Sequence, residues 1–278
     1  MAELPELETL RRALEKESVG KRFKAPEVLA TKLVSHNGTK KAFQTRLEGA
    51  KVKSVDRKGR YLVANLDSGD VLVLDLGSAG YLEKATPKSE TAKGTALVLT
   101  FTQGGQIRLV DPAGDAQAMV VASDALAEEV PDAALGGLDP VADAVSWTAF
   151  ARAILAQSTK LKTLLMDPSV VAGIGPIYSD EILWDAGLRY DRLSNELSSQ
   201  EIRRLFRSLV ETLHEAVKHR GTNLESAPFV DLYGKSGEYQ SELKVFEREG
   251  EPCRRCRAPI AKARFANRPV YFCAACQV

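Results

Sequence analysis

Cysteine is confined to the last part of this 278-residue chain, where it forms two Cys-x-x-Cys pairs. Cys253 and Cys256 make the first pair, Cys273 and Cys276 make the second, and 16 residues separate the two pairs. This spacing is typical of a four-cysteine zinc site. Each pair brings two thiolates to one side of a tight turn, so two facing turns supply a closed tetrahedral cage. The pattern predicts one structural zinc with no open position for catalysis.

Two disulfides or a redox-active Cys-x-x-Cys are the alternative readings of these cysteines. The first residues of the chain mix acidic and basic side chains and resemble neither a secretory signal nor a transit peptide. We therefore expect a cytoplasmic, reduced protein, which favours metal-bound thiolates over disulfides. No stretch approaches the ~18 apolar residues of a membrane span, so no membrane contact is expected.

Positive charge is concentrated in the same C-terminal stretch. The whole chain is nearly neutral, with 38 Lys and Arg against 37 Asp and Glu. Between Glu251 and Cys276, however, six cations accompany a single acid, and three aromatic residues lie among them. A small metal-stapled hairpin with a cationic rim is suited to binding phosphates. A solvated basic surface is the alternative.

The elements that must position these residues change character along the chain. Pro5–Val19 reads as an amphipathic helix that Gly20 ends. Between Phe23 and Val121 the period is two, and the turns Asp67–Asp70 and Thr102–Gly105 predict hairpins. This pattern indicates an antiparallel sandwich. The predicted strands are Lys51–Val55, Tyr61–Leu66, Val71–Leu76, Ala96–Phe101, Ile107–Val110 and Ala118–Val121.

The second half of the chain is helical, and a weakly periodic stretch, 126–145, is interpreted as the linker that precedes it. Ser198 with Glu201 forms a capping-box pattern, and Pro176 suits a first helical position. Trp147 and Trp184 are expected to be core residues. The predicted helices are Ser146–Gln157, Lys160–Met166, Pro176–Ala186 and Ser198–His219.

A glycine-containing turn, Asp167–Gly175, joins two of these helices. Gly173 and Gly175 lie just before the helix that starts at Pro176. Backbone N–H groups at such a helix start can bind an anion. An ordinary helix–helix turn is the alternative.

Four segments, in register and in one order, resemble the formamidopyrimidine-DNA glycosylase / endonuclease VIII family. They are MAELPELETLRR, LLMDPSVVAGIGPIYSDEILWDAG, FVDLYGKSGEYQSELKVFEREGEPC and the four-cysteine site. The resemblance implies an α+β multidomain fold with DNA in the cleft between domains. It assigns an N-terminal antiparallel β-sandwich with an N-terminal helix to 1–125, a helix–two-turns–helix domain to 146–232 and a zinc-finger hairpin to 233–278.

In that family the enzyme flips a damaged base out of the duplex, and the α-amine of an N-terminal proline attacks the sugar. The following glutamate moves protons. The resemblance places Glu3 at this glutamate, whereas Ala2 stands in place of the proline. Once Met1 is removed, Ala2 still offers a primary amine, and an α-amino group with a pKa of about 8 is partly neutral at neutral pH.

Further departures from the family pattern affect DNA contacts. Arg60 stands where the family has a lysine that contacts phosphate and assists elimination. Arginine keeps a phosphate contact but is a poor proton donor. Ser78 replaces a methionine, and Ala113–Asp115 replace an Arg-Arg-Phe run, that fill the gap left by the flipped base. Pro176 replaces a phosphate-binding asparagine.

Other DNA contacts of the family are retained. The resemblance assigns phosphate binding to Lys162, to the turn with Gly173 and Gly175, and to Arg268, which also assists elimination. Ala2, Glu3, Arg60 and Arg268 are therefore the predicted catalytic residues.

The sequence thus predicts a DNA-repair glycosylase and abasic-site lyase with altered substrate choice. We expect a monomer that binds damaged, abasic or single-stranded DNA and is nucleoid-associated when bound. A catalytically impaired DNA-binding protein on the same scaffold is the main alternative, because five family positions are changed. A zinc-stapled protein whose partner is not DNA is the third reading.

Overall fold

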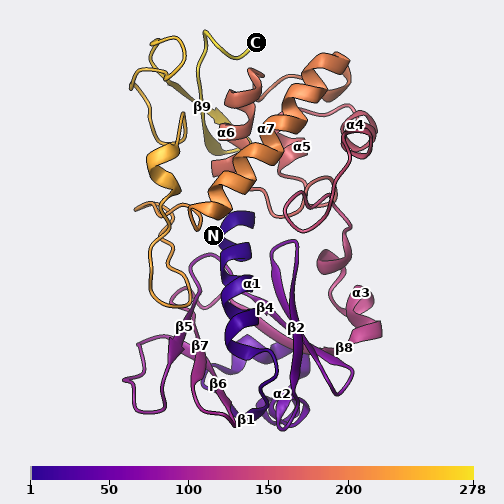
Figure 1. Ribbon diagram of the computed structural model, residues 1–278, viewed down its shortest axis with the longest axis vertical. Helices are drawn as coiled ribbons and strands as arrows, with labels where there is room; N and C mark the ends of the chain where they lie inside the picture. The colour runs from indigo at the N-terminus through magenta and orange to yellow at the C-terminus, as the bar shows by residue number, and fades with distance from the viewer. Residues whose placement is uncertain (1) are drawn as a thin grey trace. The chain divides into compact units, whose positions relative to one another are not determined.

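The computed structural model describes residues 2–278, which form two compact units (Figure 1). Unit 1 comprises residues 2–134 together with His219–Glu238, and unit 2 comprises Leu135–Lys218 and Tyr239–Val278. The chain therefore leaves unit 1 and later returns to it. The domain boundaries implied by the resemblance instead place the first part of His219–Glu238 in the helical domain and the rest in the zinc finger. None of the helices within residues 2–278 has the length and apolar character needed to span a membrane.

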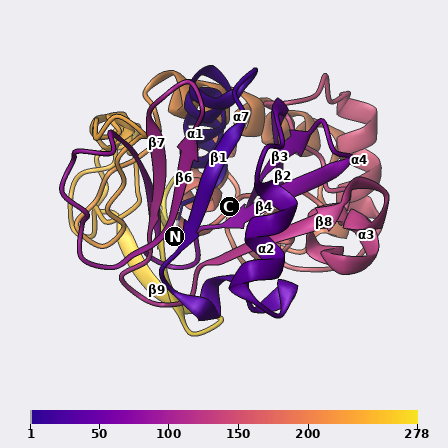
Figure 2. The same ribbon diagram turned by 90° about the horizontal axis from the view of Figure 1, so that it is seen from below.

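Unit 1 contains two four-stranded antiparallel sheets, which lie side by side in Figure 2. The order of the first sheet is β1-β6-β7-β5 and that of the second is β2-β3-β4-β8. The predicted antiparallel sandwich is therefore confirmed. The strands are β1 (Phe23–Val28), β2 (Val52–Lys58), β3 (Tyr61–Leu66), β4 (Asp70–Asp75), β5 (Tyr81–Ala85), β6 (Thr95–Phe101), β7 (Gln106–Val110) and β8 (Gln117–Ala122).

Both predicted hairpins are present, since β3 pairs with β4 and β6 pairs with β7. Sequence reasoning missed β1, β5 and the short helix α2 (Lys40–Leu47). The two missed strands are the edges of one sheet, where only one neighbour constrains the strand. Pro26 also weakens the strand pattern of β1, because a proline is tolerated at an edge but cannot donate to a ladder. Helix α2 buries only Phe43 and Leu47 and has little amphipathic pattern.

Helix α1 (Leu4–Ser18) supplies one side of the core of unit 1 and packs along β2. Leu7, Leu10 and Leu14 are almost fully buried and belong to the same apolar cluster as strand residues of both sheets. The segment His219–Glu238, which we call the return segment, contributes Phe229 and Leu232 to that cluster. Burial of these side chains explains why a segment so distant in sequence belongs to unit 1.

A carboxylate fixes the start of α1 to the start of the return segment. Glu6 is 3% exposed, and its two oxygens accept the backbone N–H of Glu3 at 2.9 Å and of Thr222 at 2.6 Å. Gly221 has φ +84°, and a Cβ there would lie 2.6 Å from Oε1 of Glu6. Only glycine fits this close approach without displacing the carboxylate.

The expected linker is ordered and divided between the units. Residues 123–134 form η2 (Ser123–Ala125), α3 (Leu126–Glu129) and η3 (Pro131–Ala134) in unit 1. In unit 2, Leu138 pairs with Val171 in a parallel bridge, and Asp139 accepts the N–H groups of Val141 and Ala142. The weak periodicity of this stretch reflects a succession of short turns.

Unit 2 is built around helices, and it ends in a two-stranded hairpin. Each predicted helix is present within one or two residues at its ends, and Pro176 occupies the first position of α6 as predicted. Gly187, in the left-handed conformation, ends α6. The elements are α4 (Trp147–Leu155), α5 (Leu161–Leu165), α6 (Pro176–Ala186), η4 (Ser194–Glu196), α7 (Ser199–Lys218), η5 (Tyr239–Glu242), β9 (Ala261–Phe265) and β10 (Arg268–Phe272).

The predicted capping box at the start of α7 is confirmed. The Ser198 backbone N–H donates to Glu201 at 2.8 Å, and the Glu201 N–H donates to the Ser198 hydroxyl at 3.3 Å. Glu201 also pairs with Arg192 at 2.6 Å. The hydrogen bond from Arg192 and those from Ser198 lower the pKa of Glu201 to about 2, although burial opposes the shift.

This lowered pKa predicts a pH-dependent contribution to stability. The folded-state pKa lies below that of an unfolded glutamate, so the stabilisation is present above about pH 4.5 and is lost as the pH falls toward 2. We expect Glu201→Gln to reduce the free energy of unfolding by about 1–2 kcal/mol at pH 7, after allowance for partial exposure. Urea unfolding at several pH values should show the difference shrinking below pH 4. As a control, Glu211→Gln on the exposed face of α7 should change stability by less than about 0.5 kcal/mol.

The Glu6 contacts lead to a second stability prediction. Glu6→Gln replaces one acceptor oxygen with an NH₂ group that faces a backbone donor, so one buried N–H loses its partner. We expect a loss of about 2–3 kcal/mol in urea unfolding. Glu15→Gln, on the same helix but 47% exposed, should cost less than about 0.5 kcal/mol. Equal, small effects of the two substitutions would contradict this role for Glu6.

Candidate functional site

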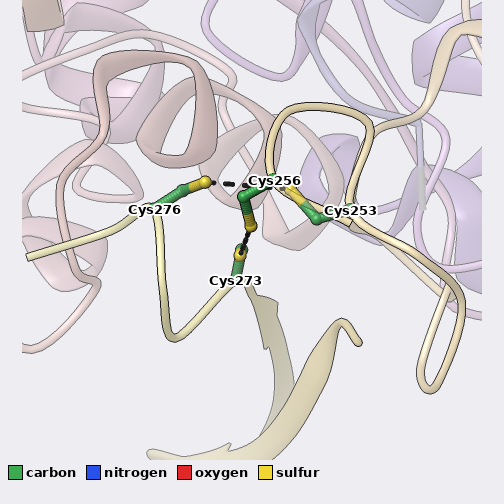
Figure 3. A group of neighbouring side chains, drawn as sticks. All are labelled: Cys253, Cys256, Cys273 and Cys276. Atoms are coloured by element: carbon green, nitrogen blue, oxygen red, sulfur yellow. Dashed lines mark hydrogen bonds between the residues drawn. The ribbon is translucent and has the colours of Figure 1, made fainter. Parts of the chain in front are cut away.

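The four cysteines converge in unit 2, as Figure 3 shows. Their sulfur atoms all lie within 4.8 Å of one another, with Cys256 and Cys273 3.4 Å apart and Cys253 and Cys276 3.9 Å apart. All four are free thiols, and Cys253 and Cys273 are completely buried. The convergence of two pairs on one point confirms the predicted metal site and contradicts the disulfide alternative.

The charges of these thiols fit a divalent cation. Burial would raise the pKa of Cys253, but N–H groups of Cys256, Arg255 and Trp184 outweigh it and lower the pKa to about 6. Burial and the neighbouring thiols raise the pKa of Cys276 to about 12. Ionisation of all four thiols together therefore needs a cation among them, and a closed sulfur cage suits zinc. The cluster holds one structural zinc.

The predicted catalytic residues Ala2 and Glu3 lie at the start of α1 in unit 1. Ala2 is partly buried and packs against the apolar core, and Glu3 is 3% exposed. Glu3 is the N-cap of α1, and its side chain accepts the N–H of Glu6 in a capping box. The positive end of the helix favours a negative charge at this point. The fate of Met1 lies outside the described residues.

Arg60, the third predicted catalytic residue, is held by an acid from the neighbouring hairpin. Its guanidinium forms an ion pair with Asp75, which is 6% exposed, and lies 5.6 Å from the centre of the Tyr61 ring. Partial burial lowers the pKa of Arg60, but the Asp75 carboxylate outweighs it, so the pKa is raised. The side chain stays charged, and its ion pair with Asp75 engages it within unit 1.

Ser78 and Asp115 lie on two exposed loops of unit 1 that hydrogen bonds join together. Both oxygens of Asp115 accept the Ser78 N–H at 3.1 Å. A Cβ at Gly77 would lie 2.3 Å from an Asp115 oxygen, so the loops approach as closely as glycine permits. Asp111 in turn accepts the N–H groups of Gly114 and Ala116. The loops therefore present no long side chain, and they carry an acid.

Lys162, predicted to bind phosphate, is buried inside unit 2. It is 2% exposed, and its ammonium contacts Asp180 at 2.5 Å, the Ser179 hydroxyl at 3.0 Å and the Pro176 carbonyl at 3.3 Å. An ammonium enclosed in this way does not reach a phosphate in this conformation. The expected role of Lys162 is therefore corrected to that of a structural residue at the start of α6.

The partner of Lys162 links three elements of unit 2. The other oxygen of Asp180 accepts the backbone N–H of Tyr271 in β10 at 3.0 Å. Burial raises the pKa of Asp180 to about 6, although the Lys162 ammonium opposes the shift. The adjacent Glu181 accepts three further N–H groups, from Lys244, Val245 and Phe246. Sequence reasoning missed both acids. Their signal was two consecutive carboxylates in a mostly apolar helix, and buried carboxylates must find partners.

The predicted anion-binding turn lies between α5 and α6. Gly175 is the N-cap of α6, Pro176 follows it, and Gly173 is partly buried in a positive-φ conformation. The predicted start of the helix is confirmed. Anion binding at this turn stays a prediction, with one donor fewer because Pro176 has no N–H.

Some cations of the finger's rim are engaged in contacts within the protein. Arg254 donates to the Ser241 carbonyl, Arg255 stacks on Trp184, and Lys262 pairs with Glu249. The side chains of Arg257, Arg264 and Arg268 are exposed, and they form no hydrogen bond or ion pair with other residues in 2–278. Arg268 follows the hairpin turn in which Ala266 and Asn267 have positive φ, a conformation that costs energy for alanine. These three arginines are the part of the rim that remains available to a phosphate.

Comparisons with known proteins agree with this arrangement. Residues 1–115 match the formamidopyrimidine-DNA glycosylase N-terminal domain, and residues 136–227 match the formamidopyrimidine-DNA glycosylase H2TH domain. Residues 250–278 match the zinc finger found in FPG and IleRS. The three matches follow one another in the order that the sequence predicts.

Similarity to individual relatives extends over the entire chain. The chain is 34% identical to formamidopyrimidine-DNA glycosylase of Herpetosiphon aurantiacus over 280 residues, with 100% of both chains covered. It is 35% identical to that of Geobacillus kaustophilus, again with 100% of both covered. A crystal structure of Lactococcus lactis Fpg with abasic-site DNA aligns with a TM-score of 0.88, 30% identity and 100% coverage of both chains. This chain is a member of the formamidopyrimidine-DNA glycosylase family.

Proposed function

We propose that this chain is a DNA glycosylase and abasic-site lyase of the formamidopyrimidine type whose substrate choice differs from that of its relatives. The observation that carries the proposal is the buried Glu3, which the capping box orients beside Ala2 at the positive end of α1. A glutamate that only complemented the helix dipole could stay exposed to solvent, whereas Glu3 is buried. The name of the relatives and the abasic-site DNA in the Lactococcus lactis complex support the same reaction class.

In this proposal Ala2 supplies the nucleophile after removal of Met1. Its α-amine attacks C1′ of the sugar, and loss of the base leaves a Schiff base on the enzyme. Glu3, the next residue, moves the proton between the amine and the sugar, and the Glu6 N–H holds its carboxyl group at the start of α1. Arg60 does not donate a proton, since its ion pair with Asp75 keeps the guanidinium charged.

The proposed difference in substrate choice follows from the two joined loops. Extrusion of a base from duplex DNA costs a few kcal/mol, and inserted side chains offset this cost. The loops that carry Ser78 and Asp115 offer a hydroxyl and a carboxylate, and the carboxylate repels the phosphate backbone. We therefore expect activity on abasic, extrahelical or single-stranded DNA, in which the extrusion cost is already low.

Binding in this proposal depends on a small number of phosphate contacts. Arg268 at the tip of the finger and the turn with Gly173 and Gly175 are the proposed contacts in unit 2. Together with a net charge of only +1, these contacts suggest moderate, salt-sensitive affinity. We propose that the protein acts as a monomer and is associated with the nucleoid when bound.

A second candidate function is DNA binding without catalysis. The observations that favour it are the engagement of Arg60 by Asp75 and the acid on the loop of Ser78. Both changes weaken contacts that help to hold and cleave the strand.

Borohydride trapping distinguishes the two functions. We expect wild-type protein, with Met1 removal verified by intact mass, to form a covalent adduct with abasic-site DNA after reduction of the Schiff base. Glu3→Gln should reduce base release from a lesion-containing single strand by about a hundredfold, because a positioned acid or base contributes at least that factor. Gel electrophoresis measures both products.

Two variants serve as controls for this experiment. Ala2→Pro keeps an N-terminal amine and should still be trapped, whereas protein that retains Met1 should give no adduct from Ala2. If wild type and Ala2→Pro both bind abasic-site DNA yet neither is trapped, the non-catalytic function is correct.

The role of Arg268 is testable through salt dependence. Arg268→Ala should weaken binding to abasic-site DNA regardless of sequence and reduce the slope of log K against log salt concentration by about 1. Fluorescence anisotropy titrations at several salt concentrations measure this slope. Arg207→Ala removes an exposed arginine from α7 and should leave the slope unchanged. Identical slopes for wild type and Arg268→Ala would exclude a phosphate contact at Arg268.

A further inference from the structure

Trp184, near the end of α6, donates a hydrogen bond to one of the metal-binding sulfurs. Its indole Nε1 lies 3.4 Å from Sγ of Cys253. Trp184 is 5% exposed and Cys253 is completely buried, so water does not compete for this contact. The backbone N–H of Arg255 donates to the same sulfur, also at 3.4 Å. Cys253 thus accepts backbone donors from the turn that carries Cys253 and Cys256, the first knuckle, and a side-chain donor from a residue 69 positions away.

Arg255, which lies between Cys253 and Cys256, holds the indole of Trp184 in place. Its guanidinium lies 4.3 Å from the centre of the Trp184 ring and donates to the carbonyls of Trp184 and Asp185 at 3.3 and 3.2 Å. These carbonyls belong to the last turn of α6, where the negative end of the helix favours a cation. Because Arg255 stands between the two cysteines of the first knuckle, indole and knuckle fix each other.

We propose that Trp184 is a positioning residue of the zinc centre, and that its N–H···S bond sets the donor strength of Cys253 and couples the metal to α6. A hydrogen bond to a thiolate withdraws electron density from sulfur, and partners outside the ligand set orient the ligand. Phenylalanine would fill a similar volume and preserve the stacking with Arg255, but it has no N–H. The proposal therefore concerns the indole N–H and not the bulk of the ring. It is independent of the proposed DNA chemistry.

The coupling extends along α6 because several of its residues contact the finger. Asp180 accepts the Tyr271 N–H of β10, and Trp184, four residues later, donates to Cys253. Residues four apart lie on the same side of a helix. The hairpin and the first knuckle are thus both fixed to one face of α6, whose other end follows the Gly173–Gly175 turn. Loss of the metal releases Cys253 and with it the contact at the end of α6.

The first test replaces zinc with Co²⁺ in the full-length protein and compares Trp184→Phe with Trp147→Phe. Trp147 is the other tryptophan of the chain, and it lies under Arg203 at the start of α4. Removal of the N–H···S bond raises the energy of the sulfur electrons. The thiolate-to-cobalt charge-transfer band should therefore shift to longer wavelength in Trp184→Phe and stay at the wild-type position in Trp147→Phe. An unshifted band in a folded, cobalt-loaded Trp184→Phe protein would overturn the proposal.

The rate of zinc transfer to a colorimetric chelator gives a second measurement. Loss of a partner outside the ligand set typically costs 10–100-fold in metal affinity. We expect zinc transfer about tenfold faster from Trp184→Phe than from wild type, and an unchanged rate from Trp147→Phe. Equal rates for all three proteins would also refute the proposal.

A third measurement keeps the proposal testable if Trp184→Phe fails to fold. Trp147→Phe retains Trp184 as its only tryptophan. In this variant loaded with ¹¹³Cd, the indole proton should show scalar coupling to the metal through the N–H···S bond. A folded, cadmium-loaded protein without this coupling would show that the indole does not donate to a metal-bound sulfur.

Discussion

Four sulfur atoms within 4.8 Å of one another constrain the whole of unit 2, because four thiolates at this distance repel one another without a cation. The finger has little apolar core of its own, so the metal supplies the cross-link that a small domain needs. α6 then holds the finger through polar contacts, with Asp180, Glu181 and Trp184 reaching three different parts of it. Arg268 is the first residue of β10, so its position depends on the metal site and on these contacts between α6 and the finger.

Unit 1 is governed by carboxylates that accept hydrogen bonds across long sequence separations. Glu6 fixes the return segment to α1, Asp75 engages Arg60, and Asp115 joins two loops. Each carboxylate satisfies donors that lie far from it in the sequence or on a neighbouring loop. Unit 1 therefore presents less positive charge around Arg60 and Asp115 than a DNA-binding surface usually has. This distribution of charge is the physical basis on which we propose an altered substrate choice.

Local patterns predicted many elements because local interactions decide them. The capping box of Ser198 and Glu201, the first-turn Pro176 and the Gly-containing hairpin turns depend on residues a few positions apart. Edge strands β1 and β5 were missed because an edge strand is defined by its neighbour and not by its own pattern. The stretch taken as a linker is ordered for a similar reason, since Leu138 pairs with a bridge partner 33 positions later.

The sequence by itself determined the zinc ligands, the sandwich, the long helices and the family, because spacing and order suffice for each of these. Only the tertiary structure decided which charged side chains remain available. Lys162 pairs with Asp180, Arg60 pairs with Asp75, and Asp115 accepts the Ser78 N–H. In each case the partner lies 15 or more positions away along the chain. The pairing of a charge depends on where the folded backbone places its neighbour, and no local pattern records that distance.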